Sequence, residues 1–376
     1  MYFGEVMTTI IIGAGASGLA AAIALKQNAP DEKITILERL SSPGKKILAT
    51  GNGRCNLTNQ HAEGFARTKR FFEGIGLMLR EEEQGRMYPY SLKAQTVLDT
   101  LLEACGKLDI DIVTDCEVTE IGRDLTVYSS KGIFMADSVI VAAGGKAQKN
   151  LGSNGSGYDL LKRLGHSVTP LSPALVQLTS SSKYPRAIKG TRTRCNIKIE
   201  LDGEIKAEEY GEILFTDYGL SGIAAMDLSH IVSENFAMDK PKKCVAVLDL
   251  APEISEAELI SHVEKFGHLR GIFGSALSDI LLKQSQGNAE TAAKIAKSWR
   301  LIVTGTKGFD FAQITGGGIP LSEVNGFESK CVKNLYICGE LLDRQFPCGG
   351  YNLDHAWVSG IAAAERIAEK RNDKNK

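Results

Sequence analysis

The stretch that decides the fold is Thr8–Leu25, TTIIIGAGASGLAAAIAL, near the start of the chain. Ile10–Ile12 have the character of a buried strand, and apolar residues recur at helical spacing after residue 18. Between them, Gly13–Gly18 form a complete Gly-x-Gly-x-x-Gly. The first glycine permits a tight turn, the second lets the backbone approach a pyrophosphate, and the third allows close packing of helix on strand. This pattern predicts a dinucleotide-binding turn; the alternative is a purely structural turn of the same shape.

An acidic residue strengthens the dinucleotide interpretation. Ile34–Leu37 are expected to form the second strand, and Glu38 follows it, twenty residues after Gly18. A carboxylate at this place accepts hydrogen bonds from ribose hydroxyls. It would also repel a 2′-phosphate, which disfavours NADP as the tightly held cofactor.

The composition limits the class of protein. The chain has 376 residues, of which 43% are hydrophobic and 24% charged, and its net charge is −1, so no overall field attracts nucleic acid or an anionic membrane. Eight cysteines without a Cys-x-x-Cys pair are expected to be reduced thiols of a cytoplasmic protein. Residues 8–25 carry no charge, but their glycines and the absence of a basic segment before them argue against a membrane span or signal peptide.

The chain changes character along its length. A strand is expected at Ser138–Ala142, before Gly144 and Gly145, and Asp202-Gly203 lies between Asn196–Leu201 and Glu204–Glu209 as a hairpin signal. Further strands are expected at Glu212–Phe215, Cys244–Leu250, Phe309–Ile314 and Leu335–Cys338, with helices over 252–301. A final helix is expected to have one apolar face, formed by Leu353, Trp357, Ile361, Ala364 and Ala368. We therefore expect an FAD-binding domain of residues 1–165 and 316–376, an inserted antiparallel β domain of 166–251 and 302–315, and a helical subdomain of 252–301.

Two further segments favour FAD over NAD. Lys45–Asn59, KKILATGNGRCNLTN, is a loop rich in Gly and Asn that a plain NAD domain does not need. Near the other end, a strand leads into Gly339-Glu340, and Cys348–Asn352, CGGYN, precedes the last helix. A helix start of this kind can direct N–H groups at the pyrimidine edge of a flavin.

With these segments in view, the chain resembles the BaiN/RdsA-like family of NAD(P)/FAD-dependent oxidoreductases, also described as aminoacetone oxidase-like flavoproteins. The resemblance covers nearly the whole length. It rests on residues 13–22, 53–59, 211–222 and, most specifically, 338–360, CGELLDRQFPCGGYNLDHAWVSG. It implies a flavin domain related to that of fumarate reductase, of the two-dinucleotide-binding type, with an inserted β-barrel-like domain that carries a helical subdomain.

The sequence departs from the family pattern at two places. Asn52 stands where a glycine is expected, but Asn tolerates a left-handed backbone. Residues 216–218, Thr-Asp-Tyr, also differ, which leaves the substrate open. The residues predicted to bind the cofactor are Gly13, Gly15, Ala16, Ser17, Gly18, Glu38, Arg39, Lys45, Asn52, Gly53, Arg54, Cys55, Asn56, Gly144, Gly339, Glu340, Gly349, Gly350, Tyr351 and Asn352.

Catalytic residues are harder to assign. Arg54 could pair with a cofactor or substrate anion or only stabilise its loop, and Cys55 is expected to be a small buried residue rather than a redox thiol. His355 in the final helix and Tyr218 could each donate a proton or merely pack. The sequence shows no Ser-His-Asp triad and no metal cluster.

The leading function is hydride transfer between FAD and NAD(P)H or a small organic substrate. A second Gly-x-Gly-x-x-Gly after a strand is absent, so NAD(P)H is expected to bind transiently. A flavin-dependent RNA-modifying transferase and a non-catalytic redox sensor are the alternatives; the absence of a basic stripe opposes the first. We expect a small-molecule substrate, with neither nucleic acid nor membrane as partner, and no oligomeric state is predicted.

Overall fold

The structure, a computed structural model, describes residues 7–374 of the chain. They divide into two compact units, one of residues up to Leu171 together with those from Ile314 onward, and the other of Ser172–Gln313. The division lies at 171/172 and 313/314, whereas the sequence-based boundaries are 165/166 and 315/316. The clustering places residues 252–301 in the second unit, and their separation as a subdomain stays a prediction.

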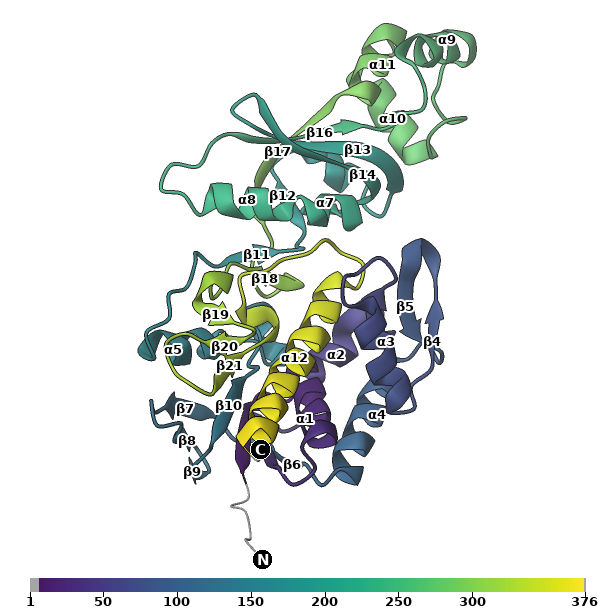
Figure 1. Ribbon diagram of the computed structural model, residues 1–376. Coiled ribbons are helices and arrows are strands. Elements are labelled where there is room, and N and C mark those ends of the chain that lie inside the picture. The colour runs from purple at the N-terminus through teal and green to yellow at the C-terminus, as the bar shows by residue number, and fades with distance from the viewer. Residues whose placement is uncertain (1–6, 375–376) are drawn as a thin grey trace, which may run out of the picture. The chain divides into compact units, whose positions relative to one another are not determined.

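A seven-stranded sheet forms the centre of the first unit (Figure 1). Its strands follow the order β19-β20-β21-β10-β1-β2-β6, and the five from β21 to β6 are parallel. The bounds are β1 (Thr8–Ile12), β2 (Lys33–Leu37), β6 (Asp111–Val113), β10 (Ser138–Val141), β19 (Val324–Asn325), β20 (Glu328–Ser329) and β21 (Leu335–Ile337). The expected βαβ start and the strands near 138 and 335 are confirmed.

The pleat of these strands divides the core into two layers, because successive side chains of a strand point to opposite faces. Ile11 and Ile140 pack with helices α1 (Ala16–Asn28), α4 (Ala94–Lys107) and α12 (Tyr351–Lys374). Ile10 and Val139 pack on the other face with α5 (Ser156–Arg163) and the three-stranded sheet β7–β9. Figure 1 shows α12, in yellow, lying alongside α1.

The remaining elements of the first unit are short. They are α2 (Lys45–Ala49), η1 (Thr50–Gly53), β3 (Thr58–Asn59), α3 (Phe65–Gly74), β4 (Leu79–Glu81), η2 (Glu83–Gly85), β5 (Arg86–Pro89), β7 (Val118–Ile121), β8 (Val127–Ser129), β9 (Gly132–Phe134), η3 (Lys149–Leu151), β18 (Ile314–Gly316), η4 (Leu321–Glu323) and η5 (Gly339–Leu341).

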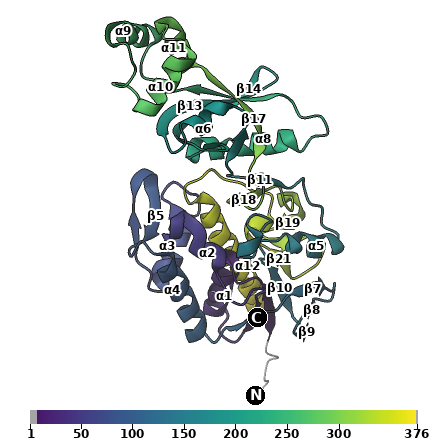
Figure 2. The ribbon, with the colours of Figure 1, turned by 180° about the vertical axis from the view of Figure 1, so that it is seen from behind.

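The second unit is a closed barrel with strand order β12-β15-β14-β13-β16-β17, seen from two sides in Figures 1 and 2. Asp202 and Gly203, with φ of 50° and 90°, make the predicted hairpin turn between β13 and β14. The barrel and its helices share one apolar core. The elements are β11 (Ser172–Ala174), β12 (Leu178–Ser180), α6 (Lys183–Ala187), β13 (Arg192–Leu201), β14 (Glu204–Phe215), β15 (Gly219–Ser221), α7 (Ile223–Asp227), α8 (Ser229–Phe236), β16 (Cys244–Asp249), α9 (Glu256–Phe266), α10 (Ser275–Gln284), α11 (Ala289–Lys297) and β17 (Trp299–Thr306).

Glu212–Phe215 are strand, as expected, and they continue the second hairpin strand without a break to form β14. Two other expectations for this unit were wrong. Residues 309–311 form a turn, and the strand that closes the barrel is β17, whose alternating buried and exposed side chains begin at Trp299, inside the stretch assigned to helix. Among the described residues, no helix has the length and apolar character that crossing a bilayer requires.

Candidate functional site

The three glycines of the N-terminal motif lie in different surroundings. Gly13 has φ of 104°, and a Cβ there would lie 2.6 Å from the Ala142 carbonyl oxygen. A Cβ at Gly18 would lie 1.9 Å from the Gly13 oxygen, so both positions are glycine because the protein itself leaves no room. Gly15, the N-cap of α1, has an ordinary φ of −89° and no atom within 4 Å of a Cβ built on it. The protein does not need glycine there, whereas a phosphate group approaching the backbone does.

Glu38 lies next to this turn at the end of β2. Its carboxylate accepts hydrogen bonds from the Ala14 and Leu40 backbone N–H groups, each at 2.8 Å. Those bonds fix the carboxylate and leave further lone pairs for ribose hydroxyls. The neighbouring Arg39 donates to the Gly152 carbonyl at 3.1 Å. The segment that leads into the loop Lys45–Asn59 contacts the same turn, because the Gly44 N–H donates to the Ala14 carbonyl at 2.9 Å.

A partly buried ion pair links the loop Lys45–Asn59 to the Gly339-Glu340 segment. The ammonium of Lys46 lies 2.7 Å from the Glu340 carboxylate, and binding of the cofactor by the neighbouring Lys45 stays a prediction. The other Glu340 oxygen accepts from the Thr315 N–H at 2.8 Å. A Cβ at Gly145 would come within 2.5 Å of Glu340, and Gly144 has φ of 72°, so this glycine pair lets the β10 loop approach the acid. Gly339 itself, with φ of 71°, faces the buried Ser17.

The loop after α2 runs through an unusual series of left-handed residues. Gly51, Asn52 and Gly53 have φ of 56°, 55° and 80°, and Cys55 has φ of 58°. The tolerance expected of Asn52 is therefore confirmed. Burial raises the pKa of the Cys55 thiol to about 12, against a smaller opposing effect of its hydrogen bond with Thr50. Cys55 is thus a neutral buried thiol, as predicted.

Arg54, in the same loop, is exposed and stacks on an aromatic ring. Its guanidinium carbon lies 4.9 Å from the centroid of Tyr88. The contact fixes the side chain without consuming its N–H donors, which stay available to an anion.

The turn before α12 is fastened to the same loop. Gly349 and Gly350 have φ of 131° and 103°, and a Cβ at Gly350 would lie 2.6 Å from the Thr58 carbonyl oxygen. The Asn59 side chain donates to the Gly349 carbonyl at 3.1 Å. Asn352 accepts from the Phe346 N–H at 3.0 Å and donates to the Phe346 carbonyl at 2.8 Å, which closes the turn in front of Tyr351.

A carboxyl group that the sequence analysis missed lies under this turn. Asp354 is 4% exposed and accepts from the Thr58 and Thr68 hydroxyls at 2.6 and 2.7 Å. Burial raises its pKa, although both hydroxyls oppose the shift. Trp357, one turn later, donates to the Leu57 carbonyl at 3.1 Å and so anchors the helix to the loop. Since 296 residues separate Thr58 from Asp354, the sequence holds no signal of this contact.

Two polar atoms near the turn are buried without a hydrogen-bond partner in the part of the chain that the structure describes. They are Asn56 Oδ1 and His355 Nε2. Burial, and secondarily the charge of Arg344, lowers the pKa of His355 to about 4. His355 is therefore neutral near pH 7, and its part as a proton donor stays a prediction. Orphaned buried polar atoms point to a missing bound group, and with the open space at Gly15 they fit a dinucleotide cofactor.

One predicted residue and three that the sequence analysis missed lie outside this group. Tyr218 belongs to the barrel unit, where the Lys307 ammonium lies 4.7 Å from its ring centroid, so its part in the site stays a prediction. His166, Glu323 and Cys331 offer metal-ligating atoms within 4.8 Å of one another, although the sequence analysis found no metal cluster. Residue spacing could not reveal this group, because 157 residues separate His166 from Glu323.

Comparisons with known proteins agree with this geometry. The family model "HI0933-like protein Rossmann domain" matches residues 7–69 and 64–366. The chain is 36% identical to a 3-dehydro-bile acid delta(4,6)-reductase of Clostridium scindens, over 96% of this chain and 98% of the relative. It is 26% identical to ribosomal RNA dihydrouridine synthases of Haemophilus influenzae and Escherichia coli, over 96% of this chain and 98% of each relative.

Among solved structures, a flavocytochrome c3 fumarate reductase shares the fold. The TM-score is 0.52 at 14% sequence identity, over 97% of this chain and 78% of that one. The family match covers nearly the whole chain, and its motif residues surround the space left at Gly15. The chain therefore belongs to the HI0933-like family, and it is an FAD-dependent oxidoreductase.

Proposed function

We propose that this flavoenzyme reduces a carbon–carbon double bond conjugated to a carbonyl group in a small organic substrate, with NAD(P)H as the transient hydride donor. The relatives' names carry the idea: a delta(4,6)-reductase of a 3-dehydro bile acid and a synthase of dihydrouridine both saturate such a bond. The relative with the small-molecule substrate is 36% identical and the RNA-modifying ones 26%, which favours the small molecule.

The observation that carries the proposal is the pair of backbone turns at Gly15 and at residues 348–352, each held in place by hydrogen bonds. The Gly15 turn leaves room for a pyrophosphate at the start of α1, and Glu38 would take the ribose. The turn at 348–352 would direct the first N–H groups of α12 at the flavin. FAD, when bound, accepts and delivers the hydride, while the chain supplies orientation and fixed dipoles.

The helix start would serve the redox step because reduced flavin carries negative charge. Donors held in place before the reaction stabilise developing charge without reorganisation. The bonds of Asn59 and Asn352 hold this turn rigid from both sides. Asp354 does not compete for those N–H groups, because its carboxyl accepts from Thr58 and Thr68 instead.

His355 is assigned a different part from the one first considered. It is a neutral ring beside Phe346, with centroids 5.5 Å apart, and its buried Nε2, which has no partner among the described residues, would form a hydrogen bond with the bound cofactor. Water is thereby kept from that side of the helix start. Tyr218 remains the candidate for the proton that must follow the hydride onto the substrate, and Arg54 the candidate for holding an anionic substituent.

The test is anaerobic reduction of the purified protein by NADH or NADPH, followed by addition of acceptors. We expect conjugated cyclic enones to reoxidise the flavin with saturation of the double bond, and matched compounds with an isolated alkene or a saturated ketone to leave it reduced. Reoxidation by none of the enones contradicts the proposal.

A second candidate function is reduction of uracil bases in ribosomal RNA, favoured by the names of the two 26% identical relatives. The chain's net charge of −1 opposes it, because RNA binding relies on clustered basic residues. Reoxidation of the flavin by a uridine-containing RNA, with formation of dihydrouridine, would decide for this candidate.

A further inference from the structure

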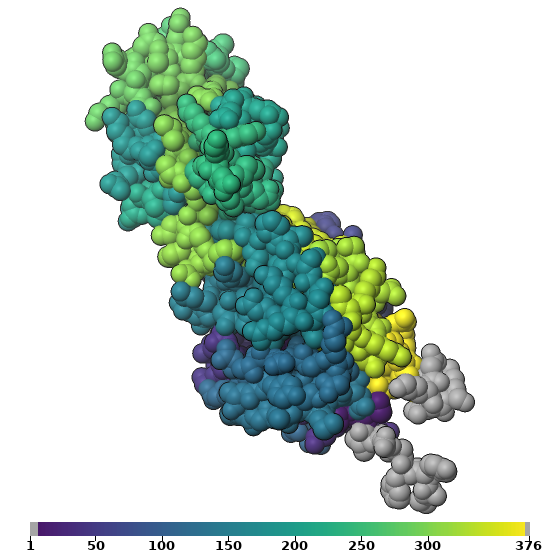
Figure 3. Space-filling view, turned by 90° about the vertical axis from the view of Figure 1, so that its left-hand side faces the viewer, coloured from purple at the N-terminus to yellow at the C-terminus, as the bar shows by residue number. Residues whose placement is uncertain are grey.

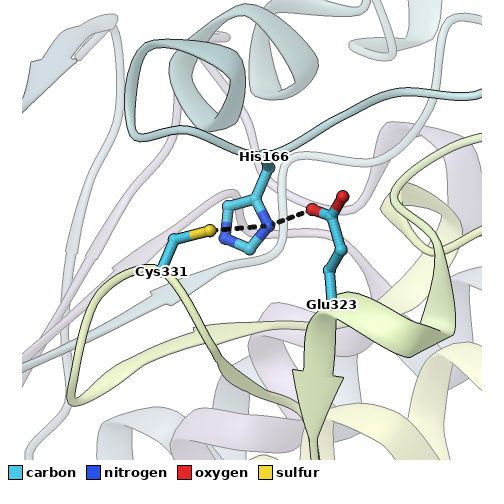
Figure 4. A group of neighbouring side chains, drawn as sticks. All are labelled: His166, Glu323 and Cys331. Atoms are coloured by element: carbon cyan, nitrogen blue, oxygen red, sulfur yellow. Dashed lines mark hydrogen bonds and ion pairs between the residues drawn. The ribbon is translucent and has the colours of Figure 1, made fainter.

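A compact cluster of side chains lies in the first unit, near the point where the chain leaves it (Figure 4). His166 follows α5, and its side chain is 0% exposed. Its Nδ1 lies 2.7 Å from a Glu323 carboxylate oxygen and 3.9 Å from the Cys331 sulfur. In Figure 3, teal-blue and yellow-green segments, distant in sequence, lie side by side on this unit.

The other ring nitrogen gives the cluster a superficial likeness to a hydrolase triad. His166 Nε2 lies 2.7 Å from Ser329 Oγ, so Ser, His and Glu stand in a row. However, Ser329 is 6% exposed, and its Oγ accepts from the Cys331 and Val332 backbone N–H groups, both at 3.0 Å. Ser329 is thus buried and held in its own turn, so its hydroxyl is not presented to a substrate as a nucleophile would be.

We propose that the cluster is a binding site for a divalent transition metal of the zinc class. The ligands are His166 Nδ1, a Glu323 carboxylate oxygen and Cys331 Sγ, and water takes the fourth position. One imidazole nitrogen, one thiolate and one carboxylate are donors that zinc and cobalt accept, whereas calcium and magnesium select oxygen ligands only.

The distances require only small side-chain movements. Tetrahedral zinc with bonds of about 2.0–2.3 Å places its donor atoms about 3.3–3.6 Å apart. The Nδ1-to-oxygen distance of 2.7 Å must widen and the Nδ1-to-sulfur distance of 3.9 Å must shorten, each by less than about 1 Å. Glu323 is meanwhile held by the Ser167 N–H, which donates to its carboxylate at 3.1 Å.

Outer contacts also suit a ligand. Metal-binding histidines direct their second nitrogen at a hydrogen-bond partner, which fixes the ring, and Ser329 holds that position here. When the metal binds, the ring proton moves to Nε2 and the thiol proton leaves to water. Cys331 and Glu323 are only partly buried, so an ion can enter from solvent.

The metal would join two parts of the chain. His166 belongs to the segment after α5, while Glu323 and Cys331 flank the hairpin β19–β20 at the edge of the central sheet. None of the three ligands is among the residues assigned to the cofactor, so the site does not depend on the proposed reaction. Its expected effect is on stability rather than on catalysis.

Cobalt(II) binding to the full-length flavoprotein tests the site. Difference spectra remove the flavin contribution, and tetrahedral cobalt absorbs in the red, beyond oxidised flavin. We expect one cobalt per chain, a thiolate-to-cobalt band, displacement by zinc, and a higher melting temperature with zinc. Cys331→Ser should abolish the thiolate band, and Glu323→Gln should weaken cobalt binding at least roughly tenfold.

Cys348→Ser is the matched control, since Cys348 is the other cysteine that is not fully buried, and it should keep the cobalt spectrum. The wild-type titration decides even if a variant fails to fold. No saturable one-to-one binding by wild type, or an unchanged thiolate band in Cys331→Ser, overturns the proposal.

Discussion

At the scale of single residues, the structure separates glycines that the fold needs from one that it does not. A Cβ at Gly13 or Gly18 would clash with neighbouring backbone atoms, whereas a Cβ at Gly15 would lie in open space. The sequence motif treats all three alike, because spacing carries no information about what surrounds each residue. Their substitutions should therefore fail in different ways.

Gly15→Val should remove FAD while leaving the apoprotein folded. The new Cβ has no protein atom within 4 Å, and the side chain would occupy the phosphate approach, so flavin content should fall by more than roughly tenfold. Gly18→Ala is the contrasting variant: its Cβ clashes with the Gly13 oxygen and should lower stability by about 1–3 kcal/mol or more. Flavin content per chain and apoprotein melting temperature measure both. Full flavin occupancy in Gly15→Val would show that the motif is only structural.

His355 makes a prediction about acid stability. The pKa of His355 is about 4 in the folded state and 6.5 in the unfolded state. Below pH 6.5 the unfolded state therefore binds a proton that the folded state does not, so the free energy of unfolding falls as the pH decreases from 6.5 towards 4. His355→Gln should remove up to about 2–3 kcal/mol of this acid destabilisation. Urea unfolding across that range measures it, and His61→Gln, at an exposed histidine, is the control. Parallel losses in wild type and His355→Gln would refute burial of the neutral ring.

At the scale of elements, helix α12 unites the candidate site. Its first turn receives the loop 44–59, and its buried stripe of Trp357, Ile361, Ala364 and Ala368 packs in the first core, as predicted. Periodicity sufficed for that stripe because it is a property of one segment. Periodicity could not predict the contacts that hold the loops together. Asn59 and Gly349 are 290 residues apart, and Lys46 and Glu340 are 294 residues apart. Such pairs become visible only when the chain is folded.

The start of α12 predicts an effect on flavin potential. Asn352→Asp keeps the acceptor for the Phe346 N–H but adds a negative charge where the proposed flavin edge lies. The charge should disfavour reduced flavin by about 1–2 kcal/mol, equivalent to roughly 20–45 mV for two electrons. Asn352→Ala, which loses both contacts with Phe346 and adds no charge, separates the effect of the charge from that of the lost contacts. A potential in Asn352→Asp that matches Asn352→Ala would remove α12 as the flavin's electrostatic partner.

At the scale of the whole molecule, the sequence predicted the class of each part better than its limits. The βαβ start, the hairpin and the last helix have local signals, so they were found. The end of the helical stretch was misplaced because Trp299–Thr306 alternates apolar and polar residues only after a run of helical periodicity. Barrel closure depends on six strands together, so the pattern of no single segment predicts it.

The final prediction concerns the two units. Each has its own apolar core, and each has its own hydrogen bonds near the points where the chain passes from one unit to the other. In the barrel unit the Gln313 N–H donates to the Leu175 carbonyl at 3.2 Å, and in the other unit the Thr169 N–H donates to the Gly318 carbonyl at 2.9 Å. A fragment of residues 172–313 should therefore fold cooperatively without flavin.

The complementary protein, with Leu171 joined to Ile314 by a short Gly-Ser linker, should stay yellow, since every residue proposed to hold FAD lies in it. It should lose enone reduction if Tyr218 supplies the proton, while reduction of the flavin by dithionite persists. Flavin content, thermal melting and acceptor turnover of both proteins measure the outcome. A folded but colourless two-segment protein would mean that the barrel unit itself holds the cofactor.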